Sequence, residues 1–135
     1  MIEAAKAHVP ARQISYTGID LFEARSPCDG PGMTLKMAHR FLQATGARIR
    51  LVPGDPFAAL AQTANSLGLI DLVVISGNVE SASLARAWFY LPRTLHGRSL
   101  VLAERRLPSA GVVIREIPAA EVHSLAWAAT SRRAA

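Results

Sequence analysis

The stretch PGDPFAALAQTANSLGLIDLVVISGN, residues 53–78, places a helix and a strand in immediate succession and decides the fold. Asp55 stands at the position of an N-cap, and Pro56 stands at the first helical position, where a missing N–H group costs nothing. Apolar residues then recur at the spacing of one helical face, and Gly68 follows as a C-terminal glycine. The pattern predicts a helix between Asp55 and Gly68.

The run LIDLVVIS, residues 69–76, is almost entirely apolar and leads into Ser76-Gly77-Asn78. Strands that are buried on both faces have this composition, and they occur in parallel sheets that helices cover. We therefore expect this run to form a buried strand of a parallel sheet.

The same alternation of strands and helices continues on both sides of this stretch. The joining segments are short, which implies right-handed crossovers and a mostly parallel sheet. The sequence predicts one α/β domain over residues 1–135, with three layers and a Rossmann-like architecture. Pro92 is expected to kink or end the helix that contains it. Further strands are predicted over 14–19, 48–52, 99–104 and 112–117, and further helices over 2–9, 34–46, 81–95 and the last part of the chain.

Composition restricts the class of protein. Hydrophobic residues make up 50% of the chain and charged residues 19%, which is typical of globular proteins. No apolar run approaches the roughly 20 residues that cross a bilayer, and the N-terminus lacks the apolar core of a signal peptide. The single cysteine, Cys28, suits a reducing compartment. We expect a cytoplasmic protein that has no membrane partner.

The charge and the histidines point to no specific partner. The formal net charge is +5, and the 15 lysines and arginines are spread along the chain. Such a charge attracts phosphate-rich partners, but no basic stretch is interleaved with aromatic residues as in single-strand binders. The four histidines lack the spacing of a metal site. We therefore expect a solvated basic surface rather than a nucleic-acid site, and we expect no metal ion.

Polar residues collect where the predicted strands end. Asp20 follows the first strand, Gly54 and Asp55 follow the second, and Ser76-Gly77-Asn78 follows the third. The carboxyl ends of parallel strands form one edge of the sheet, where ligands bind. Carboxylates at this edge favour a ligand with hydroxyl groups, an amino group or positive charge. Asp20 and Asp55 also have structural alternatives, because turns and helix caps use Asp without any ligand.

The ordered segments YTGID (16–20), LVPGDP (51–56), IDLVVISGN (70–78) and RSLVLAE (98–104) resemble those of class I S-adenosylmethionine-dependent methyltransferases. The resemblance covers about residues 14–104. It implies that Asp20 accepts hydrogen bonds from the ribose hydroxyls of S-adenosylmethionine and that Gly54-Asp55 contacts the adenine amino group. It also implies that Ser76, Gly77 and Asn78 line the methyl-transfer site. The methyl acceptor is not indicated.

This chain also departs from the family in two places. The glycine-rich first strand, which holds the methionine part of the cofactor and lies in the middle of the family's sheet, has no counterpart before Ile14. Without it, we expect a slot flanked by unpaired strand edges. The stretch from Ser76 to Val79 carries neither the acid nor the histidine that many small-molecule methyltransferases have there. No catalytic residue is therefore identified.

Two functions follow from these observations. The first is a methyltransferase-like domain that binds S-adenosylmethionine, as a fragment or an inactive form, and that would transfer a methyl group if active. The alternative is a non-catalytic binding or assembly module with a degenerate methyltransferase fold, which associates with itself as a homo-oligomer or with another protein. Nucleic-acid association through the dispersed arginines is the weakest of the hypotheses.

Overall fold

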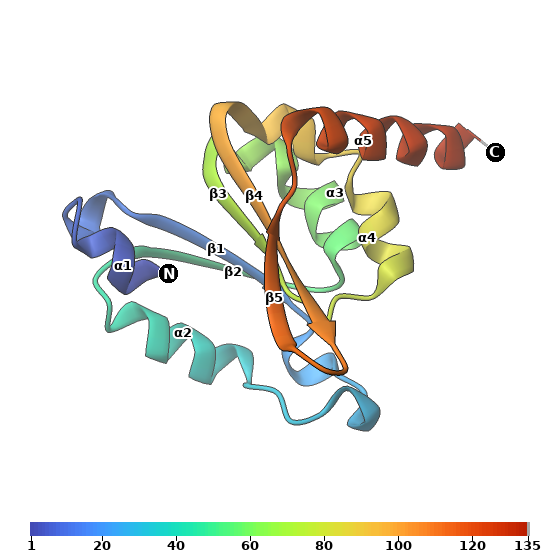
Figure 1. Cartoon of the computed structure of the whole chain (residues 1–135). Coiled ribbons are helices and arrows are strands. Elements are labelled where there is room, and N and C mark those ends of the chain that lie inside the picture. The colour runs from blue at the N-terminus through green and yellow to red at the C-terminus, as the bar shows by residue number, and fades with distance from the viewer. Residues whose placement is uncertain (135) are drawn as a thin grey trace. The chain divides into compact units, whose positions relative to one another are not determined.

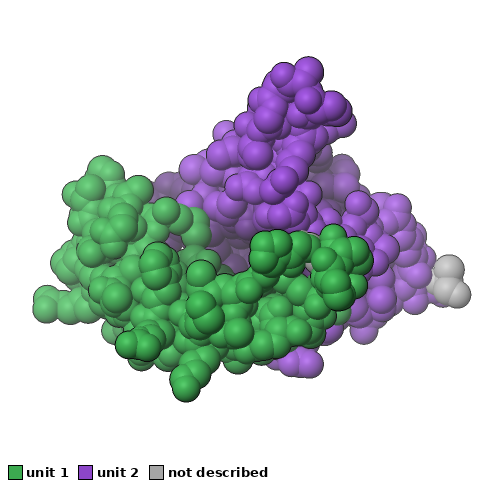
Figure 2. Space-filling view, turned by 90° about the horizontal axis from the view of Figure 1, so that it is seen from below, with its two compact units in different colours: residues 1–55 green, residues 56–135 purple. Residues whose placement is uncertain are grey.

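The computed structural model describes residues 1–134, and its helices and strands alternate along the chain except for two successive strands near the C-terminus (Figure 1). The fold is α/β, with a parallel sheet of two strands and a mixed sheet of three strands. Tertiary contacts divide the chain into two compact units, Met1–Asp55 and Pro56–Ala135 (Figure 2), while the single domain over residues 1–135 stays a prediction. No helix within residues 1–134 is long and apolar enough to span a bilayer.

The first unit is built on two parallel strands, which pair from Ser15 opposite Arg48 to Asp20 opposite Pro53. Thr34 caps the longer helix of the unit, because its hydroxyl oxygen accepts a hydrogen bond of 3.2 Å from the N–H of Met37. The elements of the unit are α1 (Ile2–Lys6), β1 (Ser15–Asp20), α2 (Leu35–Gln43) and β2 (Arg48–Pro53), with short 3-10 turns η1 (Ala11–Gln13), η2 (Phe22–Ala24) and η3 (Pro27–Asp29) between them.

The second unit begins with the helix that the sequence marks most clearly. This helix has Pro56 at its first position and Leu67 at its last, and Gly68 follows with a φ of +70°, so the predicted boundaries are confirmed. The elements of the unit are α3 (Pro56–Leu67), β3 (Ile70–Ile75), α4 (Ser81–Ala87), η4 (Leu91–Thr94), β4 (Leu95–Leu107), β5 (Gly111–Glu116) and α5 (Ala119–Ala134).

The sheet of the second unit is mixed, with strand order β3-β4-β5. β3 and β4 are parallel, with Val73 opposite Val101, whereas β4 and β5 are antiparallel, with Ala103 opposite Arg115. Only three residues separate β4 from β5, which is too short for a parallel crossover and suits a hairpin. The expectation of a mostly parallel sheet therefore holds for β3 and β4 and not for β5.

The predicted helix over 81–95 is wrong at its end. α4 stops at Ala87, and a turn and the 3-10 helix η4 follow before β4 begins at Leu95. Pro92 has no N–H group to donate to a helical carbonyl, so the α-helix ends ahead of it. Because the α-helix ends early, β4 can begin at Leu95, and it extends over 95–107 rather than over the predicted 99–104.

One face of the three-stranded sheet packs against α4, η4 and α5. Val122 on α5 is 2% exposed, and Val101 on β4 is also 2% exposed. Arg115 at the end of β5 forms two hydrogen bonds, of 2.8 and 2.7 Å, with the carboxylate of Glu121 on α5. These bonds lower the pKa of Glu121 and raise that of Arg115. The buried members of this core are Trp88, Leu91, Val101, Ile117, Val122 and Ala129.

The opposite face of the same sheet is open. Leu72 and Val74 on β3 are 37% and 43% exposed, and Leu100 on β4 is 47% exposed. The alternation of side chains along a strand places these residues on the face away from Val73 and Val101. The expectation that β3 is buried on both faces is therefore wrong, because helices cover only one side of this sheet within the second unit.

Candidate functional site

Pairing of the strands brings Asp20 and Gly54 together at one end of the first unit. Asp20 is the last residue of β1 and lies opposite Pro53, and the N–H of Gly54 donates a hydrogen bond of 2.9 Å to the backbone oxygen of Asp20. Asp55 follows directly and precedes α3. The carboxyl ends of β1 and β2 therefore present one carboxylate beside a glycine turn.

The carboxylate of Asp20 is engaged by its own loop. One oxygen accepts a hydrogen bond of 3.3 Å from the N–H of Phe22, and the other forms an ion pair with the guanidinium of Arg25. Phe22 has a φ of +48°, a conformation that costs a non-glycine residue of order 1–3 kcal/mol, and its side chain is buried. The Asp20 contact helps to hold this turn, so the structural alternative for Asp20 has a concrete basis. A ribose hydroxyl would have to replace Arg25 at this oxygen.

Gly54 occupies a backbone conformation that other residues rarely adopt. Its φ is +135°, in a region that is essentially restricted to glycine, although no atom lies within 4 Å of the position that a Cβ would take. The turn at the end of β2 thus depends on glycine for backbone conformation rather than for space. The open space beside Gly54 leaves its backbone accessible to a ligand.

The remaining candidates form a turn at the end of β3 in the second unit. The N–H of Val79 donates a hydrogen bond of 3.2 Å to the oxygen of Ser76, which closes the turn around Gly77 and Asn78. The N–H of Gly77 donates to Glu104 Oε2 at 3.3 Å. A Cβ on Gly77 would lie 3.3 Å from the backbone oxygen of Glu104, so the turn packs closely on the end of β4. Ser76, Gly77 and Asn78 are all exposed.

At the opposite end of β3, the structure brings together Asp71, His96 and Ser99, which sequence spacing did not single out as a group. His96 Nε2 lies 3.0 Å from Asp71 Oδ1, while Nδ1 accepts a hydrogen bond from the N–H of Arg98 at 3.1 Å. The bonding pattern therefore assigns the ring proton to Nε2. The Ser99 hydroxyl donates to the oxygen of Ile70 at 2.6 Å and accepts from the N–H of His96 at 2.8 Å.

This trio does not form a nucleophilic site. A serine nucleophile must pass its proton to the imidazole, but the hydroxyl proton of Ser99 points to a backbone carbonyl and the acceptor nitrogen of His96 is occupied. The three side chains instead fix the backbone where the register between β3 and β4 shifts, between Ile70 and Leu72. Among the side chains that the structure describes, no group of three His, Cys, Asp or Glu residues is placed to hold a metal ion.

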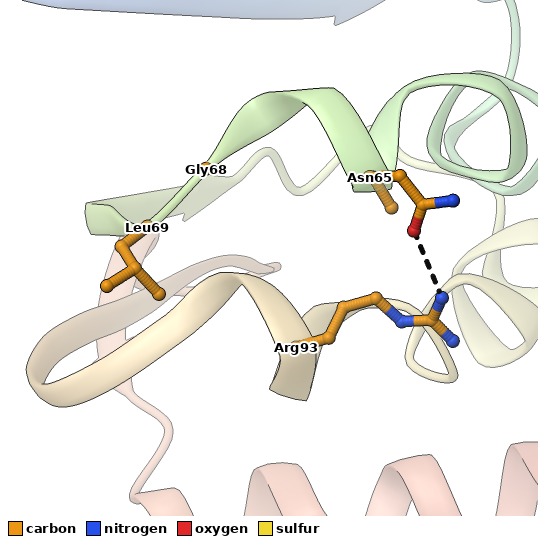
Figure 3. A pocket seen from close by; sticks show the side chains of 5 residues that line it. Asn65, Gly68, Leu69 and Arg93 are labelled. Carbon is orange, nitrogen blue, oxygen red and sulfur yellow. Dashed lines mark hydrogen bonds between the residues drawn. The ribbon is translucent and has the colours of Figure 1, made fainter.

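Two hollows on the second unit are lined by arginine. The smaller one, of about 320 Å³, lies between α3 and η4, where Arg93 reaches toward Asn65 and donates to Oδ1 at 3.4 Å (Figure 3). The larger one, of about 520 Å³, contains three arginines and two phenylalanines. Neither hollow is lined by any of the six candidate residues. The residues of the larger hollow come from segments as far apart as Phe57 and Arg133, so no local pattern in the sequence reveals it.

The conformation of Gly54 generates a prediction. Gly54→Ala forces an alanine to a φ of +135°, which we expect to lower the free energy of unfolding by about 1–3 kcal/mol. Gly97→Ala is the matched control, because Gly97 has no positive φ and open space around its Cβ position, and it should change stability by less than about 0.5 kcal/mol. Urea unfolding followed by circular dichroism measures both. An equal loss in the two variants would contradict the assignment of strain to Gly54.

Comparison of the chain with protein-family models, with curated proteins and with solved structures found no match. The case for a function therefore depends on the geometry of the two strand ends, on the open sheet and on the resemblance of the short motifs.

Proposed function

We propose that this chain is a class I S-adenosylmethionine-dependent methyltransferase-like domain whose sheet is completed by a strand and a helix from another polypeptide segment. One observation carries the proposal. Among the described strands, β1 pairs only with β2, and β3 pairs only with β4. In the family that the motifs resemble, the glycine-rich strand lies between the two strands that correspond by order to β1 and β3. An added strand in this position would pair with both free edges and give a three-layer Rossmann-like sheet.

The open face of the second unit supports the same proposal. Leu72, Val74 and Leu100 present apolar side chains that no helix of the unit covers. A parallel sheet of this type is covered by helices on both faces, and a helix that accompanies the added strand would cover these side chains. One added strand–helix pair would thus occupy both the unpaired edge and the uncovered face.

The polar groups at the strand ends suit the cofactor. The carboxylate of Asp20 would accept hydrogen bonds from the ribose hydroxyls after Arg25 moves away, and Gly54-Asp55 would approach the adenine. The turn at Ser76, Gly77 and Asn78 would lie near the methyl group. Methyl transfer from a sulfonium requires mainly that donor and acceptor are held in line, so the reaction needs no general base at this turn.

Titration calorimetry with S-adenosylhomocysteine tests the cofactor site. We expect micromolar binding by the 135-residue chain, and binding at least about tenfold weaker in Asp20→Ala and Asp55→Ala, because each loses a charged acceptor that is worth about 1.5–3 kcal/mol. Asp71→Ala is the matched control, since Asp71 lies at the opposite end of β3, and it should bind like the parent chain. Circular dichroism confirms that the variants are folded. No detectable binding by the folded parent chain would overturn a cofactor site formed by the strand ends of this chain alone.

A second candidate function is assembly through self-association, which the open apolar face and free edge of β3 favour. Two copies could pair their β3 strands across a two-fold axis, because such an interface joins the same surface on each copy. This pairing would satisfy the backbone groups at the edge and extend the apolar surface of Leu72 and Val74. The occupant of the edge is then a second copy of this chain, and no cofactor is required.

Sedimentation velocity tests this candidate. We expect the parent chain to form dimers as its concentration rises, and Val74→Lys to remain monomeric because it places a charge in the apolar surface beside the edge. Val9→Lys is the control, since Val9 is 41% exposed in the first unit, and it should dimerise like the parent chain. A parent chain that stays monomeric at high concentration, or a dimer that survives Val74→Lys, would contradict self-association through β3.

A further inference from the structure

The larger hollow of the second unit combines positive charge with aromatic surface. Its volume is about 520 Å³, and small alanines of α4 and α5 leave room between the longer side chains. None of the six candidate residues lines this pocket, so the inference below does not rest on the cofactor site proposed above. The residues that line it are Phe57, Ala82, Ala85, Arg86, Phe89, Ala129, Arg132 and Arg133.

Two of the three arginines in the pocket lie over its aromatic rings. Arg86 Cζ lies 3.7 Å from the centroid of the Phe57 ring, and Arg133 Cζ lies 4.9 Å from the centroid of the Phe89 ring. Stacking holds a guanidinium over the ring face, while the N–H donors lie in the guanidinium plane and point outward from its edge. The contact with a ring restricts each of the two side chains before a ligand arrives.

Among the described side chains, no carboxylate pairs with the arginines of the pocket. The lining contains no Asp or Glu, and the ion pairs found within residues 1–134 involve none of Arg86, Arg132 and Arg133. Three guanidinium groups around one hollow repel one another, and an anion bound among them relieves this repulsion. The arrangement therefore favours a ligand that carries more than one negative charge.

We propose that this pocket binds a small molecule through a phosphate monoester or diphosphate group. The guanidinium fork matches the oxygens of a phosphate in a bidentate manner, and a phosphate monoester or a diphosphate supplies the multiple charge that a single carboxylate lacks. The volume lies within the range of about 300–1,000 Å³ that small-molecule sites occupy. Phe57 and Phe89 add apolar surface to the lining.

Calorimetric titration of the full chain with sodium pyrophosphate tests the proposal. We expect saturable binding that becomes about tenfold weaker or more in Arg86→Gln and in Arg133→Gln, because each removes a charge-assisted donor pair. Arg105→Gln is the matched control: Arg105 is an exposed arginine on β4 of the same unit that does not line the pocket. It should weaken binding by less than about twofold.

The comparison of variants separates specific binding in the pocket from non-specific attraction of anions to a basic protein. Arg86→Lys keeps the charge but loses the planar fork, so its affinity should fall between those of the parent chain and Arg86→Gln. Equal weakening in all three glutamine variants, or no saturable binding by the folded parent chain, would overturn the proposal. A single-stranded oligonucleotide that binds through Arg86 when pyrophosphate does not would also overturn it, in favour of a nucleic-acid groove.

Discussion

The packing of one sheet face against α4, η4 and α5 is the interaction on which the second unit depends. Val101 and Val122 meet in this layer with almost no exposed surface, and each fully buried side chain of this kind contributes about 1.5–3 kcal/mol. All helices that pack on β3, β4 and β5 within the unit lie on this one face of the sheet. Within the second unit, no helix therefore covers the apolar side chains of Leu72, Val74 and Leu100. The partners proposed for the chain follow from that face and from the adjoining edge.

Local sequence signals predicted the elements of the fold well. α3 begins at Pro56 and ends before Gly68, as predicted. β1, β2 and β3 lie within one residue of their predicted positions. Each of these elements depends on residues that are close together in the chain. Whether a face of a strand is buried depends instead on helices from other segments of the chain. The run 69–76 predicted burial on both faces and could not show that, within the second unit, helices cover one face only. The antiparallel β5 could have been predicted, since three residues cannot form a crossover.

The candidate site divides in the same manner. That Asp20 and Gly54 follow neighbouring strands is visible in the sequence, and strand pairing makes them neighbours. The ion pair of Asp20 with Arg25 and its hydrogen bond from Phe22 depend on the path of the loop, which composition does not specify. The positions of the arginines over the phenylalanine rings could not be predicted from the sequence for a different reason. Arg86 and Arg133 belong to two helices, and only the tertiary fold places each over a phenylalanine.

Amide hydrogen exchange along β3 and β4, measured by NMR at a concentration where the chain is monomeric, tests the central claim that β3 has a free edge. Leu102 and Ala103 of β4 pair with strands on both sides, so their amides should exchange slowly. Alternate amides of β3 point away from β4, and the account predicts that these exchange at rates close to those of exposed backbone. Protection of every β3 amide to the level of Leu102 and Ala103 would contradict it, because the edge would then already be paired.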